Sequence, residues 1–373
     1  MHIAIISVAP PYRGGISKFS SVLVRKLSSK HLVKVINFKR QYPKFLFPGV
    51  SQYLDSSEVL GERCIDSLNP INWFKVGRKL SKSKFDLIIF NIWNPFFSPS
   101  LGMIALQIRK KSPNTKLVSL CHNIYPHEKI PFSHLLIKYL LNIMHGHIVL
   151  SNQTKNELIE MLERPNYIKC FHPIYNSFNA KIDKNIAKKK ISIRSKNIIL
   201  FFGIIRPYKG FDILLKAISL LNKKEIDFHL LVAGECYENK TKYIDLINKL
   251  GISHLITWHD KYVSDNEVST YFSASDVTVL PYKTASQSGI AQIAYFYDIP
   301  ILASDVGGLP EIINNGKTGC IFKTTNYKQL SEILFEKISK NKFKEMSRNV
   351  SYYKKKFSWK NFIDAIENLY NKI

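Results

Sequence analysis

The segment that most constrains the fold is residues 197–210, Asn-Ile-Ile-Leu-Phe-Phe-Gly-Ile-Ile-Arg-Pro-Tyr-Lys-Gly. Its apolar run Ile198–Phe202 is typical of a buried parallel strand, which ends at Gly203 before a short turn with two cations, Arg206 and Lys209. Helically spaced apolar residues follow at Phe211, Leu214, Leu215, Ile218 and Leu221. A strand, a glycine turn, two cations and a helix N-terminus predict a receptor for a phosphate or diphosphate, because the free N–H groups, the helix dipole and both cations attract an anion.

The same alternation of strand-like and helical patterns runs along the whole chain. It predicts βαβ units and parallel sheets covered by helices on both faces. At 373 residues the chain exceeds a comfortable single core. We therefore expect an α/β protein with two Rossmann-like domains, in which ligands bind beyond the carboxyl ends of the strands. Strands are expected at residues 2–8, 33–38, 86–91, 116–121 and 147–151, and at residues 198–203, 228–234, 277–280 and 300–303.

The domain boundary is predicted from composition. Residues 179–196 are polar and rich in lysine, and they lack a sustained apolar run, so we expect a linker there between domains at 1–178 and 197–356. Residues 39–71 are predicted to be an irregular insertion, and such an insertion in a compact domain is more often functional than idle.

The net charge of +26 is unevenly spread. Residues 1–190 hold 29 Lys and Arg against 10 Asp and Glu, whereas residues 191–373 hold 25 against 18. Any single basic cluster is best interpreted as a solvated surface. The excess in the first half nevertheless favours a surface that meets anionic lipid headgroups or an anionic acceptor. No zinc spacing or RNP-like aromatic pair is present, so nucleic acid is not an expected partner.

Targeting and redox signals are sparse. The N-terminus lacks a basic n-region and a cleavage site, so we expect no signal peptide. No window offers about 18 uninterrupted apolar residues. The five cysteines have no close spacing, which predicts reduced thiols in a cytoplasmic protein and no metal cluster.

Six short motifs, taken in order, resemble one known family. They are Pro10–Ile16, Cys121–Glu128, Gly203–Gly210, Leu231–Glu235, Ser273–Pro281 and Pro300–Glu311. Together they resemble the family-4 glycosyltransferases of the GT-B fold, of the retaining group 1 type, over nearly the whole chain. The resemblance implies two Rossmann-like domains that face each other across a deep cleft, and a C-terminal helix at 357–373 that crosses back onto the N-terminal domain. It also implies a retaining transfer without a metal or other cofactor, consistent with the absence of an Asp-x-Asp motif.

The chain departs from the family pattern at one place. The family usually carries two glutamates eight positions apart ahead of Pro300, and those positions fall on Ala285 and Ile293. The intervening stretch offers Gln287, Ser288 and Gly289 instead. The glutamine and serine side chains supply neutral donors and acceptors, and the backbone at 288 and 289 supplies N–H groups at a helix N-terminus. We therefore expect a variant branch that keeps a phosphate contact without the glutamate pair.

Three residues are expected to carry catalysis. Breaking the anomeric C–O bond of a nucleotide sugar builds charge on the leaving diphosphate, and Arg206 and Lys209 should stabilise it, since this electrostatic effect is usually the largest. By resemblance, His122 contacts the transferred sugar, although a histidine at a strand end is alone more often a structural hydrogen-bonding group.

Further residues are expected around the donor. Gly15 would let the backbone approach the diphosphate closely. Glu235 bears on the cleft or stabilises its turn, and the two alternatives are even. The loop around Tyr262 is expected to meet the nucleotide base. Glu311 either binds substrate hydroxyls or belongs to a helix start after Pro310, which is slightly favoured.

The acceptor side is expected in the first domain. Arg13 belongs to the glycine loop there, and His127 with Glu128 form either acceptor-binding groups or a pair that fixes the loop. The aromatic cluster Trp93–Phe97 suits core packing better than an acceptor-lipid groove, though both remain open.

The resulting reading is a cytoplasmic glycosyltransferase, peripheral at the inner leaflet of the membrane. It would move a sugar from a nucleotide diphosphate-sugar to a lipid-linked saccharide in the synthesis of a bacterial surface polysaccharide or glycolipid. Two alternatives stay open: a non-catalytic sugar-nucleotide or glycan-binding partner of a transferase, and a nucleotide-sugar epimerase of the same fold.

Overall fold

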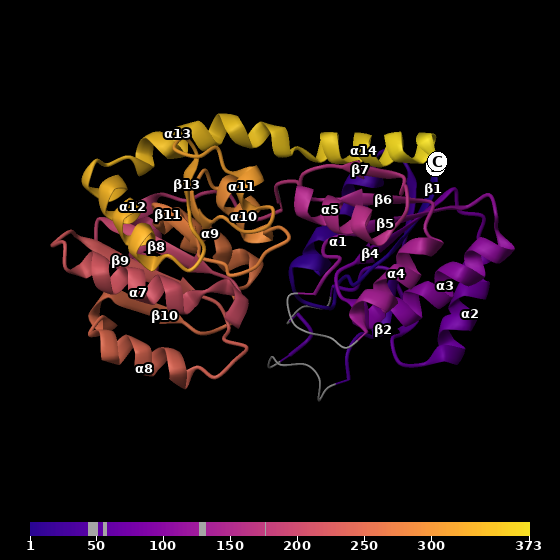
Figure 1. Ribbon diagram of the computed structural model, residues 1–373, viewed down its shortest axis with the longest axis horizontal. Coiled ribbons are helices and arrows are strands. Elements are labelled where there is room, and N and C mark those ends of the chain that lie inside the picture. The colour runs from indigo at the N-terminus through magenta and orange to yellow at the C-terminus, as the bar shows by residue number, and fades with distance from the viewer. Residues whose placement is uncertain (44–50, 55–57, 127–131, 176) are drawn as a thin grey trace. The chain divides into compact units, whose positions relative to one another are not determined.

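The computed structural model describes residues 1–43, 51–54, 58–126, 132–175 and 177–373 (Figure 1). The chain divides into two compact units. Unit 1 comprises Met1–His172 and Trp359–Ile373, and unit 2 comprises Pro173–Ser358. Both are α/β units built on parallel sheets, as the alternating sequence pattern predicts.

Unit 1 is built on one parallel sheet, with seven strands in the described residues and the order β3-β2-β1-β4-β5-β6-β7. The order reverses between β1 and β4, so loops that leave these neighbouring strands diverge there. The central strand β4 is buried along its whole length, as expected for a sheet covered on both faces. The strands are β1 (His2–Ile6), β2 (Leu32–Arg40), β3 (Glu62–Asp66), β4 (Leu87–Ile92), β5 (Lys116–Cys121), β6 (Gly146–Val149) and β7 (Tyr167–Lys169).

Helices cover both faces of this sheet. One core cluster joins side chains of the sheet to α2, α3, α4 and α5, while α1 and α14 contact each other and α14 also contacts β6 and β7. Side-chain caps fix several starts, as at Asn69, which accepts a hydrogen bond from the Asn72 N–H. The helices are α1 (Gly15–Leu27), α2 (Pro70–Ser81), α3 (Ser98–Lys111), α4 (Ser133–Ile143), α5 (Asn152–Met161) and α14 (Trp359–Lys372), with the short 3-10 helix η2 (Pro95–Phe97) before α3.

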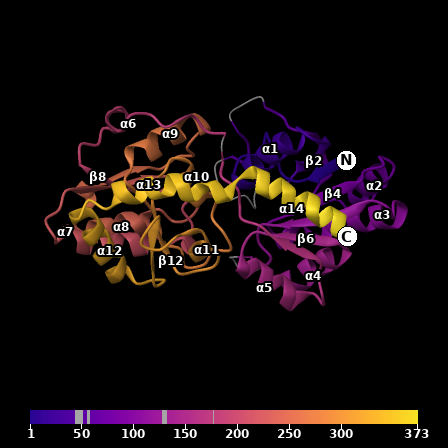
Figure 2. The same cartoon turned by 90° about the horizontal axis from the view of Figure 1, so that it is seen from above.

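The C-terminal helix α14 belongs to unit 1 and runs beside β6 (Figure 2). Its apolar face is buried, at Trp359, Phe362, Ile363, Ile366 and Leu369. The end of the chain is tied down by Lys116, whose Nζ donates to the Ile373 carbonyl at 2.6 Å. None of the helices in the described part of the chain is both long and apolar enough to span a membrane.

Unit 2 repeats the same topology. Its parallel sheet has six strands in the described residues, in the order β10-β9-β8-β11-β12-β13, and the order reverses between β8 and β11. The strands are β8 (Asn197–Phe202), β9 (Phe228–Ala233), β10 (Ile256–His259), β11 (Val277–Leu280), β12 (Ile301–Ser304) and β13 (Gly319–Phe322).

The core of unit 2 lies mainly on the face covered by α7, α8, α12 and α13. The helix after the first strand carries the apolar stripe expected from the sequence, with Phe211, Leu214, Leu215, Ile218 and Leu221 all fully buried. The helices are α6 (Lys184–Lys190), α7 (Phe211–Asn222), α8 (Thr241–Leu250), α9 (Asp265–Ala274), α10 (Gly289–Phe296), α11 (Leu309–Ile312), α12 (Tyr327–Ser339) and α13 (Phe343–Tyr353), with the 3-10 helices η3 (Pro207–Lys209), η4 (Ser253–Leu255) and η5 (Lys354–Phe357).

Residues 179–196, expected as a linker, are instead part of unit 2. Asp183 caps α6 by accepting hydrogen bonds from two backbone N–H groups, and Lys184 forms an ion pair with Asp276. Ala187, Ile191 and Ile193 are buried, so a few spaced apolar residues suffice to dock this lysine-rich segment. The chain leaves unit 1 after His172, earlier than the boundary at 178 that composition suggests.

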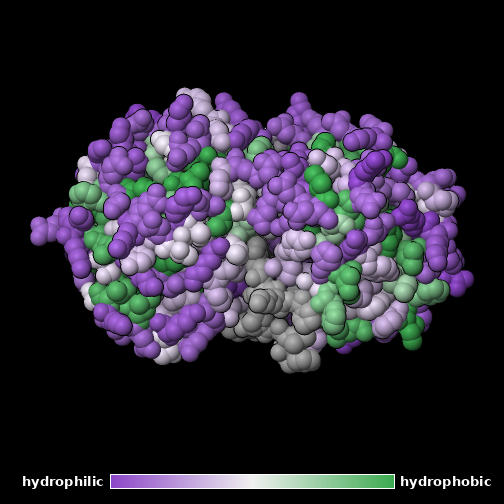
Figure 3. Space-filling model, in the orientation of Figure 1, coloured by the Kyte–Doolittle hydropathy of each residue, from purple (hydrophilic) through white to green (hydrophobic). Residues whose placement is uncertain are grey.

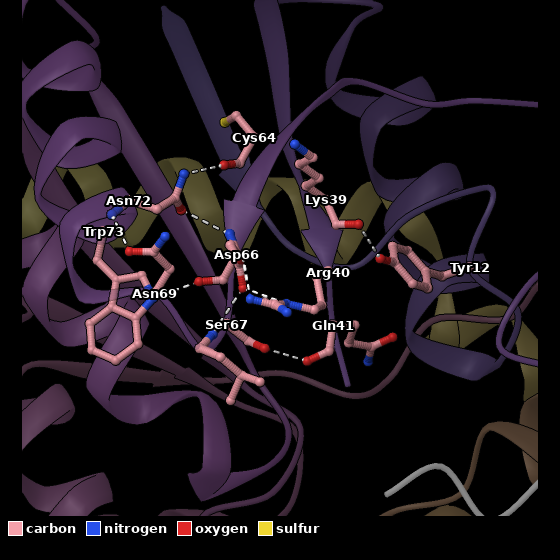
Figure 4. Close-up of polar contacts among 11 residues, drawn as sticks. Tyr12, Lys39, Arg40, Gln41, Cys64, Asp66, Ser67, Asn69, Asn72 and Trp73 are labelled. Carbon is pink, nitrogen blue, oxygen red and sulfur yellow. Dashed lines mark hydrogen bonds and ion pairs between the residues drawn. The ribbon is translucent and has the colours of Figure 1, made fainter. Parts of the chain in front are cut away.

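Residues 39–71 are more regular than predicted, because they contain β3 and the start of α2. Figure 4 shows how polar contacts hold this region to β2. Arg40 donates two hydrogen bonds to the Asp66 carboxylate, at 2.7 and 2.6 Å, and Trp73 Nε1 donates to the Asp66 carbonyl at 2.6 Å. The strands β3, β7 and β13 were not expected from the sequence, since each has five residues or fewer, and β3 and β7 also have almost no buried residues.

Candidate active site

The candidate site of unit 2 lies where the strand order reverses. The loop after β8 and the loop after β11 leave neighbouring strands at the carboxyl edge of the sheet. The predicted diphosphate residues Arg206 and Lys209 are on the first of these loops, and Gln287, Ser288 and Gly289 end the second. The sheet topology thus brings both predicted groups to one edge, which is where ligands bind in open α/β sheets.

Two glycines allow the loops after β8 and β9 to approach each other closely. Gly203 has φ +94° and Gly234 has φ +153°. A Cβ atom at Gly234 would lie closer to the Gly203 carbonyl than real Cβ atoms ever approach an oxygen. The next residue, Glu235, is buried, and its carbonyl accepts a hydrogen bond from the Ile205 N–H at 2.9 Å. The backbone of Glu235 therefore holds the turn that carries the cations.

Lys209 is a buried cation. It ends the 3-10 helix η3 and is only 8% exposed. A Cβ atom at Gly203 would lie 3.2 Å from Lys209 Nζ and 3.1 Å from Ile290 Cδ1, so the amine and the first turn of α10 both lie beside the glycine that follows β8. Burial, and then the neighbouring Arg206 charge, lower the pKa of Lys209 to about 7.

Arg206 precedes η3 and is half-buried. Its guanidinium carbon lies 5.4 Å from the centre of the Tyr237 ring, a distance at which the ring face attracts a cation. Because Arg206 lowers the pKa of Lys209, the two cations are close enough to repel each other. Two cations held together at a cost in energy are an arrangement that an anion would stabilise.

The N-terminus of α10 completes this edge. Ser288 caps the helix by accepting a hydrogen bond from the Ala291 N–H at 3.4 Å, and it also bonds to the side chain of the buried Tyr282. Gln287 Oε1 is buried and has no hydrogen-bond partner in the described residues. A Cβ atom at Gly289 would lie 3.4 Å from Tyr175 Oη. The helix start is thus capped by Ser288 and adjoins the buried Gln287 oxygen.

The two positions of the expected glutamates are apolar and buried. Ala285 is 3% exposed and Ile293 is 7% exposed. The two positions therefore bring no formal charge to this edge.

In unit 1, His122 follows β5 directly. Its backbone N–H donates to the Ile92 carbonyl at 2.8 Å, which extends the ladder to β4. The ring is 1% exposed, and neither ring nitrogen has a hydrogen-bond partner among the described residues. Burial, and then His172, lower the pKa of His122 to about 3, so the imidazole is neutral at physiological pH.

The glycine loop of unit 1 lies between β1 and α1. Gly14 has φ +117°, and a Cβ atom at either Gly14 or Gly15 would meet no described atom within 4 Å. The Arg13 N–H donates to the Gln52 carbonyl at 2.9 Å, and the rings of Tyr12 and Tyr53 lie 5.1 Å apart. The loop is therefore anchored by residues 51–54, while the start of α1 is open.

The remaining predicted residues are scattered. Tyr262 is half-buried in the loop after β10, which is two strands from β8, and Glu311 lies on the short helix α11. His127 and Glu128 lie outside the described residues. In the aromatic cluster, Phe97 is buried in the core, which bears out the expectation of core packing for that ring.

The structure adds residues that the motifs do not contain. His172 is buried beside Phe19, whose ring also contacts His122, and Tyr175 is buried beside Gly289. His172 follows β7, a strand that the sequence did not predict, so no strand-end signal marked it. No sequence signal marks Tyr175 or Phe19, because their contacts come from segments far apart in the chain.

Comparison with known proteins places the chain among sugar transferases. Residues 183–357 match the family model described as "Glycosyl transferases group 1". An uncharacterized glycosyltransferase of Methanocaldococcus jannaschii is 25% identical over 385 residues, which cover 100% of this chain and 99% of that protein. Sucrose-phosphate synthase of Thermosynechococcus elongatus aligns with a TM-score of 0.76 at 17% identity, over 100% of this chain and 98% of that one. HepE of Anabaena, in complex with UDP, aligns with a TM-score of 0.75 at 16% identity, over 100% of both chains.

These similarities confirm the prediction of fold class and of enzyme class. Both units are Rossmann-like and the architecture is that of GT-B proteins. Residues 183–357 form a glycosyl transferases group 1 domain, and the chain is a glycosyltransferase. Assignment to family 4, and to a branch without the glutamate pair, stays a prediction.

Proposed function

We propose that the enzyme transfers a sugar, with retention of anomeric configuration and without a metal, from a nucleotide diphosphate-sugar to a saccharide acceptor. The observation that carries the proposal is the buried Lys209 amine, which lies beside Gly203 at the end of β8 and close enough to Arg206 to feel its charge. A cation whose pKa is lowered by burial gains most from an anion that enters beside it. The solved structures of HepE with UDP and with UDP-glucose support a nucleotide-sugar as the anion.

In this proposal the donor diphosphate occupies the carboxyl edge of unit 2. Arg206 offers a planar fork of donors and Lys209 a point charge, and the N–H groups at the start of α10 add the helix dipole. When the anomeric C–O bond breaks, its electron pair passes to the diphosphate oxygen. The acceptor hydroxyl forms the new bond to the anomeric carbon, and its proton passes to the departing diphosphate oxygen. The two cations stabilise the charge that builds on the leaving group.

His122 is proposed to contact the sugar rather than the phosphates. Its pKa of about 3 keeps the ring neutral, so one nitrogen donates and the other accepts. Both nitrogens have no partner in the described residues, and a buried polar atom without a partner is costly. A sugar hydroxyl would satisfy at least one of them. Gln287 Oε1 is proposed to accept a hydrogen bond from a donor hydroxyl for the same reason.

The acceptor is proposed to be a lipid-linked saccharide that unit 1 meets at the cytoplasmic surface of a membrane. Of the 13 large apolar side chains that are exposed in the described residues, ten lie in unit 1. Three of them, Leu68, Ile71 and Phe74, lie at the start of α2, and Phe132, Leu135 and Tyr139 lie along the start of α4. Figure 3 shows apolar side chains at the surface on this side of unit 1.

Charge around these helices fits an anionic lipid surface. Lys75 and Arg78 are exposed on α2, Lys82 is exposed just after its end, and Lys138 is exposed on α4. Unit 1 as a whole holds 26 Lys and Arg against 11 Asp and Glu. Two effects contribute to binding at a membrane surface: apolar side chains enter the headgroup layer, and nearby cations attract anionic lipids.

The donor assignment is tested by thermal unfolding with UDP, GDP, ADP and CMP and their sugar conjugates. A ligand of the native state raises its stability with the logarithm of ligand concentration. We expect one nucleotide to raise the melting temperature of the wild type, and Arg206→Ala to abolish both that shift and transfer while the fold survives. Lys249→Met, which removes an exposed cation of α8, is the control. A normally active Arg206→Ala enzyme would remove the diphosphate assignment, and a folded protein that binds none of the nucleotides would favour the non-catalytic partner.

The membrane assignment is tested by sedimentation with vesicles of phosphatidylglycerol and phosphatidylcholine. Ile71→Ser should lower the bound fraction, whereas Ile244→Ser, an exposed isoleucine of unit 2, should leave it unchanged. Binding should also weaken as salt rises, because the cations contribute. Equal binding to vesicles of phosphatidylcholine alone would contradict the role of charge.

A further inference from the structure

Phe19 is the centre of an aromatic cluster in unit 1. It lies on α1 and is fully buried. Its ring centre is 4.9 Å from that of His122, with the planes at 87°, and 5.0 Å from that of His172, with the planes at 67°. The rings of Trp359 and Phe362 lie 5.3 and 5.6 Å away. Such tilted and edge-to-face pairs are the favoured arrangements of aromatic rings.

The contact with His122 matters because this imidazole lacks the usual support. A functional histidine ordinarily has its ring orientation fixed by a hydrogen bond to one nitrogen. Neither nitrogen of His122 has such a partner in the described residues. What the described structure provides instead is packing, and Phe19 lies nearly perpendicular to the imidazole.

The other neighbours of Phe19 stand at the two points where the chain passes between the units. His172 is the last residue of the first segment of unit 1, and Trp359 is the first residue of its second segment. Just beyond them, inside unit 2, the Ile174 N–H donates to the Phe357 carbonyl at 3.0 Å. The two crossing segments are therefore tied to each other on one side and packed against Phe19 on the other.

We infer that Phe19 is a positioning residue, which fixes the His122 imidazole for sugar transfer and links its orientation to the two chain crossings at His172 and Trp359. The inference rests on the proposed contact between His122 and the transferred sugar. Phe19 itself touches no substrate in this account. A shift of either crossing segment moves a ring that packs on Phe19, and no hydrogen bond from the described residues holds the imidazole against that shift.

The test compares Phe19→Leu with Phe85→Leu. Phe85 is also a buried phenylalanine of unit 1, at 4% exposed, and its ring packs on His2 at the edge of the sheet where β1 and β4 begin. Both changes remove a ring from the core, so both should lower the melting temperature to a similar extent. Only Phe19→Leu should lower kcat, by about tenfold or more, while the KM for the donor changes less than about threefold, because misplacing a reacting group costs rate rather than binding.

A second readout does not depend on activity. The pKa of His122 is measured by NMR of the full-length protein with 13C-labelled histidine. In Phe19→Leu it should rise from the value in the wild type, because water reaches the ring, whereas Phe85→Leu should leave it unchanged. Trp359→Leu should lower kcat in the same way and less than additively with Phe19→Leu, as expected for residues that act through one another.

The outcomes separate the two levels of the proposal. If Phe19→Leu matches Phe85→Leu in kcat and in the His122 pKa, the positioning role is wrong and Phe19 is only core packing. If His122→Ala retains full kcat, the proposed role of His122 fails first, whatever Phe19 does. Loss of activity in His122→Ala and in Phe19→Leu, with Phe85→Leu unaffected, is the result expected.

Discussion

Replacing Lys209 by methionine should stabilise the free protein while removing nucleotide binding. The buried amine has a pKa lowered from 10.5 to about 7 by burial and by Arg206. Below pH 7 the lysine is protonated in both the native and the unfolded state, and the native state carries the whole penalty of the buried charge. A depression of about 3.5 pKa units corresponds to roughly 5 kcal/mol, as an upper bound. Methionine fills a similar volume without a charge, so we expect Lys209→Met to unfold with a free energy a few kcal/mol larger at pH 6.

The sign of the pH dependence distinguishes this account from a simple packing effect. Between pH 7 and about 10 the unfolded chain binds more protons at Lys209 than the native state does, so the stability of the wild type rises with pH. The gap between the variant and the wild type should therefore shrink by about 3 kcal/mol from pH 6 to pH 9, since each pKa unit is worth about 1.4 kcal/mol. Urea unfolding at several pH values measures the gap, with Lys249→Met as the control that shows none.

The result that would refute the reasoning is a gap that stays constant from pH 6 to pH 9, or a variant that is less stable than the wild type at pH 6. Either would mean that the amine is not held as a destabilised cation. The companion measurement adds the nucleotide that binds the wild type. Stabilisation of the wild type but not of Lys209→Met would show that the anion compensates for the energetic cost of the buried charge.

Two further predictions follow from the turn geometry and from α10. Gly210→Ala should lower the free energy of unfolding by more than about 2 kcal/mol, because φ is +67° and the new Cβ would collide with the Pro281 carbonyl. The control Gly251→Ala has the same φ but open space around the new Cβ, so it should lower the free energy of unfolding by about 1 kcal/mol. Equal losses of stability in thermal melts of the two variants would contradict the clash. Gln287→Ala should raise the donor KM about tenfold, as expected for one lost hydrogen bond, and leave the acceptor KM within about twofold; equal effects on both substrates would remove Gln287 from the donor site.

The sequence predicts the parts of the fold that depend on long apolar runs. β4, β5, β8 and β9 are buried along most of their length, and each is a largely apolar stretch of the sequence. β7 could not be predicted in the same way, because it has three residues, all half-buried, and among the described strands it pairs with β6 alone. A short strand of this kind exists because its neighbour supplies hydrogen-bond partners, and that information is not local.

The candidate site likewise has one part that local sequence predicts and another part that depends on contacts between distant segments. Arg206 and Lys209 were predictable, because a strand, a glycine and a helix start adjoin in the chain and place both cations at one sheet edge. The close packing of Gly210 against the end of β11, and of Tyr175 against α10, joins segments more than 70 residues apart. Contacts of this kind depend on how the strands are ordered, and the apolar patterns do not state that order.

The distribution of charge predicts which group controls the pH dependence of transfer. His122 is neutral above about pH 4, since its pKa is about 3, and Gln287 does not titrate. Lys209, with a pKa of about 7, is the group that changes charge in the working range of an enzyme.

In the free enzyme the amine loses its proton as pH rises above 7, so kcat/KM for the donor should fall by up to about tenfold per pH unit there. A bound diphosphate raises the pKa of Lys209, because an adjacent anion favours the charged form, and kcat should therefore stay flat to a higher pH than kcat/KM. In Lys209→Arg, whose charge does not titrate, the fall in kcat/KM above pH 7 should disappear even if the rate is lower. An acid limb near pH 6.5 in the wild type that vanishes in His122→Gln would instead assign the control to the histidine.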